Sequence, residues 1–152
     1  MIKPIPSGYN TITPYLVLAD ADRAIRFYTV ALGAEERYRL RTPDGNLAHV
    51  ELQIGDSRLM ASSENPAWGA RSARSIGGCP IGLCLYTKDV DALAERFVAA
   101  GGKVIRPLQD QFYGDRSGQF EDPEGYVWTL AQHIVEVAPA EMQRRMNEMM
   151  GG

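Results

Sequence analysis

Residues 20–33 read DADRAIRFYTVALG and residues 89–102 read DVDALAERFVAAGG, so one pattern recurs at an offset of 69 residues (from 20 to 89). In each copy an aspartate precedes apolar residues at helical spacing and a glycine follows them, which predicts a capped amphipathic helix. A second match, residues 55–61 against 125–131, has an offset of 70. Two similar halves in 152 residues predict one pseudo-symmetric domain, because each half alone buries too little core.

The segments around the two helices repeat as well. Period-two alternation and turn residues predict strands at 11–18, 36–41, 47–54 and 58–62 in the first half, and at 82–86, 103–107, 119–121 and 126–132 in the second. Each half therefore has the order strand, helix, three strands. The sequence predicts an α+β fold of two βαβββ modules.

We expect a single domain over residues 1–152, with module one at about 9–62 and module two at about 79–135. Residues 63–78 are rich in Ser, Gly, Asn and Pro and form a linker, long enough to act as a lid or to let modules exchange between two chains. A C-terminal helix is predicted at about 139–150. Its methionine stripe, expected to pack against the domain or a partner subunit, is Met142, Met146, Met149 and Met150.

Charge and composition exclude several classes of protein. The net charge of −3 comes from intermixed signs, without the basic stripe of a nucleic-acid surface. No signal peptide is recognisable, and no apolar run approaches the roughly 20 residues that span a bilayer. Cys79 and Cys84 lack the spacing of a zinc site or a disulfide framework and are expected to be free thiols. We expect a cytoplasmic protein that binds neither membrane nor nucleic acid.

Three motifs resemble one protein family. Phe27-Tyr28 and Leu32-Gly33 in the first helix, and Asp122-Pro123-Glu124-Gly125 before the last strand, are similar to the vicinal oxygen chelate superfamily, which includes glyoxalase I, bleomycin-resistance proteins and extradiol dioxygenases. The resemblance covers about residues 9–135. Residues 64–69 and 111–116 resemble a PhnB-like, or glyoxalase-like, subgroup. The resemblance implies a curved mixed sheet around a cavity, and a homodimer.

Metal-binding members of that superfamily carry one ligand on the first strand and one on the last strand of each module. Here the four positions fall on Thr13, Leu59, Gly82 (give or take one residue) and Thr129. None of them is His, Glu or Asp, the donors that divalent metals need in such sites. We therefore expect no metal and no other cofactor, and a bound divalent metal is the alternative.

Strand alternation predicts which side chains face the cavity. The inward set is Thr13, Tyr15, Val17, His49, Glu51, Gln53, Ser57, Leu59, Ala61, Gly82, Cys84, Tyr86, Gln119, Glu121, Val127 and Thr129. Trp128 alternates with this set and is assigned to the core. Such a mixed lining suits an organic ligand that carries some polar groups.

His49 and Glu51 are the candidate catalytic pair, because they lie two residues apart on one strand and so on the same face. A carboxylate beside an imidazole can provide a general acid or base. A solvated outer strand face would look the same, and it is the simpler interpretation of one pair without a nucleophile or a metal. His133 follows the last predicted strand and is interpreted as a surface or capping residue.

Residues 110–118 are interpreted as a glycine-flanked hairpin at the cavity mouth. Arg116 could bind a carboxylate or phosphate through two parallel hydrogen bonds, or contact its own backbone in a turn closed by Asp115. Trp68 would stack on a flat ligand or cover the core of its own chain or a partner. The predicted ligand-binding set is Tyr15, Trp68, Cys84, Tyr86, Phe112, Tyr113, Asp115, Arg116, Gln119 and Thr129.

Three functions are consistent with these patterns. The first is a metal-free protein that binds a small organic molecule between the modules, as the resemblance to bleomycin-resistance proteins implies. The second is a metal-dependent lyase, isomerase, dioxygenase or thiol transferase of the same superfamily. The third is metal-free acid–base catalysis through His49 and Glu51. The expected partners are a small-molecule ligand and a second copy of the chain.

Overall fold

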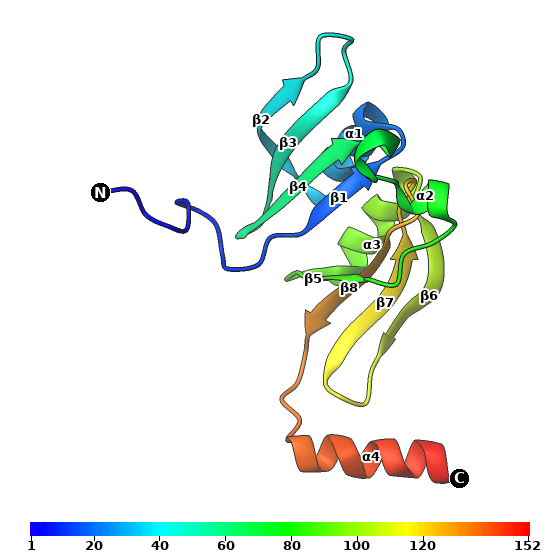
Figure 1. Ribbon diagram of the computed structural model, residues 1–152. Helices are drawn as coiled ribbons and strands as arrows, with labels where there is room; N and C mark the ends of the chain where they lie inside the picture. The colour runs from blue at the N-terminus through cyan, green and yellow to red at the C-terminus, as the bar shows by residue number, and fades with distance from the viewer.

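The computed structural model describes all residues 1–152 and contains two βαβββ modules (Figure 1). Module one consists of β1 (Tyr15–Leu18), α1 (Ala21–Leu32), β2 (Glu35–Arg41), β3 (Leu47–Ile54) and β4 (Ser57–Ser63). Module two consists of β5 (Leu83–Tyr86), α3 (Val90–Ala99), β6 (Lys103–Asp110), β7 (Asp115–Glu121) and β8 (Val127–His133). The linker holds the short helices η1 (Pro66–Trp68) and α2 (Ala73–Ile76), and α4 (Pro139–Gly151) follows module two. The predicted α+β class is confirmed.

Both long helices begin where the repeat predicts. The side chain of Asp20 accepts a hydrogen bond from the backbone N–H of Arg23, and the side chain of Asp89 accepts one from Ala92. These caps satisfy amide groups that have no partner within the first turn of the helix. Helix α1 ends at Gly33, whose φ of 66° is the left-handed conformation that a glycine adopts without strain.

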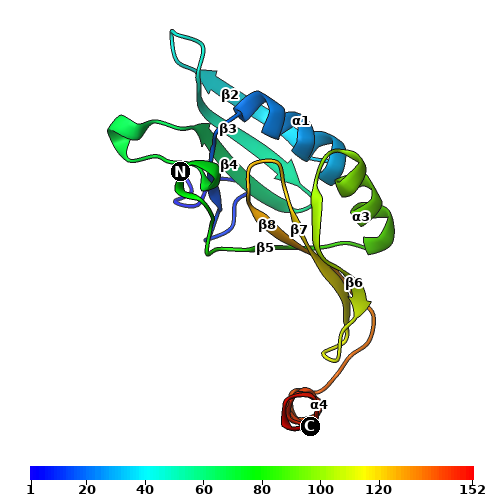
Figure 2. The ribbon, with the colours of Figure 1, turned by 90° about the vertical axis from the view of Figure 1, so that its right-hand side faces the viewer.

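The strands form two four-stranded sheets with the same topology, β1-β4-β3-β2 and β5-β8-β7-β6. In each sheet the first strand of the module runs parallel to the last, and the other pairs are antiparallel. Helices α1 and α3 contact each other, so the modules meet through their helical sides (Figure 2). The sheet face turned away from the helix, here called the open face, carries exposed side chains such as Tyr15 and Tyr86.

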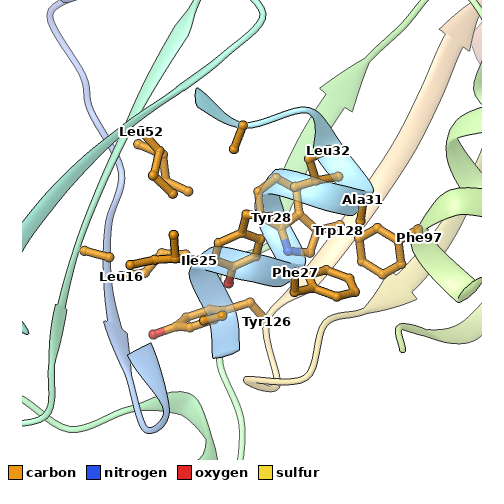
Figure 3. Close-up of a cluster of buried hydrophobic side chains, with 14 of the residues drawn as sticks. Leu16, Ile25, Phe27, Tyr28, Ala31, Leu32, Leu52, Phe97, Tyr126 and Trp128 are labelled. Carbon is orange, nitrogen blue, oxygen red and sulfur yellow. The ribbon is translucent and has the colours of Figure 1, made fainter. Parts of the chain in front are cut away.

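The core lies between the helices and the inner sheet faces. Val50 and Leu52 of β3 are fully buried, as the alternation along that strand predicts. Phe27 of α1 and Phe97 of α3 stack edge to face with their ring centroids 4.9 Å apart, which joins the modules (Figure 3). Trp128 is 4% exposed in the same cluster, so its assignment to the core is confirmed.

The turn at residues 122–125 joins the two modules. The Asp122 carboxylate accepts hydrogen bonds from the hydroxyl of Tyr28 (2.6 Å) and the indole N–H of Trp128 (2.9 Å). The fully buried Glu124 carboxylate accepts the backbone N–H groups of Ala19 (2.6 Å) and Asp20 (3.0 Å) at the start of α1. Burial raises the pKa of both carboxyl groups. Beyond forming a tight turn, this segment therefore fastens module two to module one.

Residues 110–118 do form a hairpin, but its unpaired tip is shorter than the sequence predicts. Strand β6 continues to Asp110 and β7 already begins at Asp115, so only residues 111–114 form the hairpin tip. Strands β6 and β7 approach closely at Gly118. A Cβ atom at this position would lie 2.7 Å from the Arg106 carbonyl oxygen, so only glycine fits there without a shift of the backbone. Two register shifts in the β6–β7 pair accompany this close approach. The point where this pairing ends is set by backbone hydrogen bonds between β6 and β7, which leave no periodic signal in the sequence.

Helix α4 projects away from both modules and has no buried residue (Figures 1 and 2). Arg145 donates a hydrogen bond to the carbonyl oxygen of Phe112 in the hairpin tip (2.9 Å). Met146, Met149 and Met150 are exposed, so the methionine stripe does not pack on the chain's own core. No helix of the chain is both long enough and apolar enough to cross a membrane.

Candidate functional site

A cavity of about 460 Å³ lies between the modules and is here called the inter-module cavity. Its walls come from the segment before β1, the β3–β4 turn with the start of β4, strand β5, and Trp128. Polar groups reach it from Thr13, Arg58 and Cys84, while leucines of β4 and β5 provide an apolar wall. A smaller cavity of about 290 Å³, lined mostly by apolar residues, lies beside it along β1.

Only two of the predicted ligand-binding residues, Cys84 and Tyr86, line the inter-module cavity. Tyr15 lines the smaller cavity. Cys84 is exposed as a whole residue, but its sulfur atom is partly shielded from water, which raises the pKa of the thiol. Thr129 lies opposite Cys84 in the β5–β8 pair, and Gln119 lies opposite Thr129 in the β7–β8 pair. These three side chains therefore form one row across the open face of the second sheet.

The candidate catalytic pair lies in a hydrogen-bonded network on the open face of the first sheet. Tyr15 Oη and His49 Nδ1 are 2.9 Å apart, and His49 Nε2 lies 3.4 Å from Glu51 Oε1. Tyr38 donates its hydroxyl to the same Glu51 oxygen at 2.8 Å. The side chains of His49 and Glu51 are 20% and 13% exposed. The pair is thus held by two tyrosines instead of projecting freely into solvent.

A second network occupies the open face of the second sheet. Asp115, nearly buried, accepts a hydrogen bond from the Tyr86 hydroxyl (2.7 Å) and lies 2.8 Å from His133 Nδ1. The bond to Asp115 raises the pKa of Tyr86 to about 12, and the carboxylates of Asp115 and Glu136 raise the pKa of His133. His133 is exposed, as a surface residue should be, but it is the last residue of β8 and pairs with Asp115, so its placement after the strand is wrong. Tyr113 is hydrogen bonded to Ser117 at 3.0 Å.

Arg116 lies apart from these groups. Its guanidinium forms ion pairs with Asp91 on α3 (2.7 Å) and with Asp110 (3.1 Å), which raise its pKa. Because side chains alternate along a strand, Arg116 and Asp115 project from opposite faces of β7. Phe112 forms an edge-to-face pair with Tyr113 in the hairpin tip. Trp68 is 85% exposed in the linker.

The two modules match at a constant offset of 69 in their last strands, and this corrects one of the four metal-ligand positions. Met60 lies opposite Tyr15 in the first sheet, as Thr129 lies opposite Cys84 in the second. Leu59 is 4% exposed and corresponds to Trp128, so Met60, not Leu59, is the counterpart of Thr129. The thioether of Met60 is a soft donor and a poor ligand for most divalent metals. Nowhere do three or more His, Cys, Asp or Glu side chains gather closely enough to hold a metal ion.

The same one-residue error in the register of β4 left Arg58 out of the predicted cavity lining. The sequence alignment placed Ser57, Leu59 and Ala61 on the inward face of β4, but Ala61 is fully buried and Leu59 nearly so. Arg58 instead pairs with Gln53, which shares the open face with Glu51. Arg58 could have been identified from the pairing of β3 with β4 across the Gly55 turn. Residues directly opposite each other in such a hairpin share a face, so Arg58 must lie on the same face as Gln53.

Comparison with known proteins agrees with this architecture. Residues 9–130 match the family model described as Glyoxalase/Bleomycin resistance protein/Dioxygenase superfamily. The uncharacterized protein Rv0887c of Mycobacterium tuberculosis is 39% identical over 144 residues, which cover 93% of this chain and 85% of that protein.

Solved structures show the same fold. Protein PA1353 from Pseudomonas aeruginosa is 26% identical, with a TM-score of 0.67 over 83% of this chain and 99% of that one. The fosfomycin resistance protein FosX from Listeria monocytogenes, a variant in complex with Mn(II) and dihydroxypropylphosphonic acid, is 17% identical, with a TM-score of 0.62 over 90% and 97% of the two chains. The similarity to the PhnB-like subgroup stays a prediction. With two βαβββ modules and a family match over most of its length, the chain belongs to the Glyoxalase/Bleomycin resistance protein/Dioxygenase superfamily.

Proposed function

We propose that this protein binds a small organic molecule in the inter-module cavity without a metal ion. The observation that carries the proposal is the cavity itself, whose volume of about 460 Å³ is in the range of small-molecule sites. Its lining combines leucines of β4 and β5 with hydroxyl, thiol and guanidinium groups. Such a lining removes apolar surface from water and still orients the polar groups of a ligand.

The residues at the four metal-ligand positions support a site that works without a metal ion. The four positions that would carry ligands are Thr13, Met60, Gly82 and Thr129, and none offers an imidazole or a carboxylate. FosX shows that this fold accommodates Mn(II) in another protein. At 17% identity, however, the likeness extends to the fold alone.

Binding is tested by thermal shift and fluorescence titration with a panel of aromatic and amphipathic compounds, with and without prior treatment with a chelator. Metal content of the purified protein is measured in parallel. We expect saturable binding that the chelator leaves unchanged and no stoichiometric metal. A bound metal whose removal abolishes ligand binding would refute the metal-free site.

A second candidate function, acid–base catalysis, is favoured by the Tyr15–His49–Glu51–Tyr38 network. Two tyrosines orient the imidazole and the carboxylate, as a proton-transfer pair requires. The test is exchange of the α-protons of small 2-oxo acids with D₂O, followed by proton NMR. Exchange that is lost in a His49→Asn variant and kept in a His133→Asn variant would support it, and the absence of exchange in the wild type would eliminate it.

We also propose a homodimer. Tyr15, Tyr38 and Tyr86 on the open faces are 48%, 46% and 62% exposed, and α4 buries none of its residues within the chain. Exposed aromatic side chains that gather on a sheet face are typical of surfaces that contact another protein. Sedimentation equilibrium should give twice the chain mass of 16.8 kDa, and a monomer at micromolar concentration would contradict the proposal.

A further inference from the structure

Arg58 is an unpaired cation in the wall of the inter-module cavity. It lies near the start of β4, and its Nε atom is buried with no hydrogen-bond partner. None of the ion pairs in the molecule includes it. A guanidinium is always charged and has five N–H donors, so leaving it without an acceptor costs free energy.

The N-terminal segment holds this guanidinium in place without neutralising it. The Cζ atom of Arg58 lies 5.4 Å from the centre of the Tyr9 ring, a cation–π arrangement. Gly8 lies directly against the guanidinium, since a Cβ atom built on it would be 2.9 Å from Arg58 Nη2. Its φ of +84° also favours glycine at this position. The arginine is therefore positioned, while its charge stays available.

The rest of the cavity lacks an internal counterion for Arg58. Asp56 is the one acidic residue in the lining, and its carboxylate accepts a hydrogen bond from the hydroxyl of Ser57 (3.1 Å) instead of pairing with Arg58. Ile12 and Leu83 line the same cavity and present apolar surface. The site thus combines one free cation with an apolar wall.

We propose that Arg58 binds the acidic group of an amphipathic organic anion, whose apolar part packs against the β5 side of the cavity. Carboxylates, sulfonates and phosphates present paired oxygens that match the guanidinium fork. The inference rests on the proposed binding function and specifies its ligand class. Arg58 is then a specificity-determining residue, because a neutral analogue of the same shape would leave its charge without a partner.

The test uses two fluorescent probes with similar aromatic bodies, anilinonaphthalene sulfonate, which is anionic, and N-phenylnaphthylamine, which is neutral. Both are titrated into the wild type and into Arg58→Gln, Gly8→Ala and Arg106→Gln variants. Arg106 lies on β6, outside the cavity lining, so its variant removes the same charge elsewhere. Thermal melting of each variant confirms that it is folded.

For Arg58→Gln we expect the affinity for the sulfonate to fall by roughly tenfold or more, as for loss of a charge-assisted hydrogen-bonded pair, with the affinity for the neutral probe unchanged. Gly8→Ala should lower the affinity for the sulfonate but not for the neutral probe, because the added Cβ displaces the guanidinium. Arg106→Gln should leave the affinity for both probes unchanged. If both probes bind and Arg58→Gln weakens neither, or both equally, the inference is wrong and the binding cavity stands. If neither probe binds the wild type, the proposed binding function fails as well.

Discussion

Replacing Glu124 with glutamine tests how the two modules are held together. Its two carboxylate oxygens accept the N–H groups of Ala19 and Asp20 from inside a fully buried site. A glutamine offers one carbonyl oxygen, and its NH₂ group must then face the second backbone donor, which is left unsatisfied. The substitution therefore removes one hydrogen bond to a charged group and orphans one buried donor.

The expected cost follows from one loss and one gain. Removing the acceptor leaves one buried backbone donor unsatisfied, which costs about 1–3 kcal/mol, and the bond lost was one to a charged group, which puts the cost in the upper part of that range. Against this, the neutral amide avoids the desolvation that raises the pKa of Glu124. We expect the free energy of unfolding to fall by about 2 kcal/mol, which corresponds to a decrease of roughly 4–8 °C in Tm for a chain of this size.

Urea denaturation at pH 7, followed by the fluorescence of the buried Trp128 and by circular dichroism, measures this change. The matched control is Glu121→Gln, because Glu121 is a half-buried carboxylate on the adjoining strand β7 and does not contact module one through a hydrogen bond. The control should lie within about 0.5 kcal/mol of the wild type. If Glu124→Gln also falls within that range, the carboxylate contributes nothing net and the reasoning from buried donors is refuted.

Three further predictions concern pH, the second network and the core. Since the pKa of Glu124 is raised in the folded state, the folded protein gains additional stability when this group binds a proton. That additional stability is fully present below the unfolded pKa of about 4.3 and is lost as pH rises through the folded value, whereas the hydrogen bonds to Ala19 and Asp20 remain. The difference in unfolding free energy between wild type and Glu124→Gln should therefore grow on acidification, and a difference that shrinks would contradict the direction of the shift. Asp115→Asn should lower the pKa of His133 toward 6.5 in an NMR titration. Glu136→Gln should give a smaller decrease, because Glu136 is more exposed and its contact with His133 is longer, 3.2 Å against 2.8 Å for Asp115; an unchanged pKa in both variants would show that neither contact persists in solution. Phe97→Ala should cost about 3–5 kcal/mol in urea denaturation, because it empties a fully buried site against α1, and a loss below 1 kcal/mol would mean that the modules do not share this core.

Local patterns were sufficient for the elements and for the faces of several strands. The two helices were predictable because capping aspartates and helical spacing act within a few residues, as Asp20 and Asp89 show. The alternation along β3 predicted that His49 and Glu51 share a face opposite buried Val50 and Leu52. These features depend on neighbours in the chain, so the sequence contains them directly.

The register of β4 could not be predicted from the sequence to within one residue, and the error changed which residues were assigned to the site. An alignment at an offset of 70 placed Leu59 in the position that hydrogen bonding gives to Met60, and it left Arg58 unnoticed. A shift of one residue moves every side chain of a strand to the other face. The same holds for β7, where pairing with β6 extends the strand to Asp115 and places Arg116 against α3 instead of the cavity.

The sequence by itself therefore determined the repeat, the α+β class, the helices and the family of this protein. The tertiary structure decided which residues meet: Glu124 with the start of α1 more than 100 residues earlier, Asp115 with His133 and Tyr86, and Arg58 with the N-terminal segment. The physical reason is that helix periodicity and capping are set by interactions between near neighbours, whereas these contacts depend on strand register and on the packing of one module against the other.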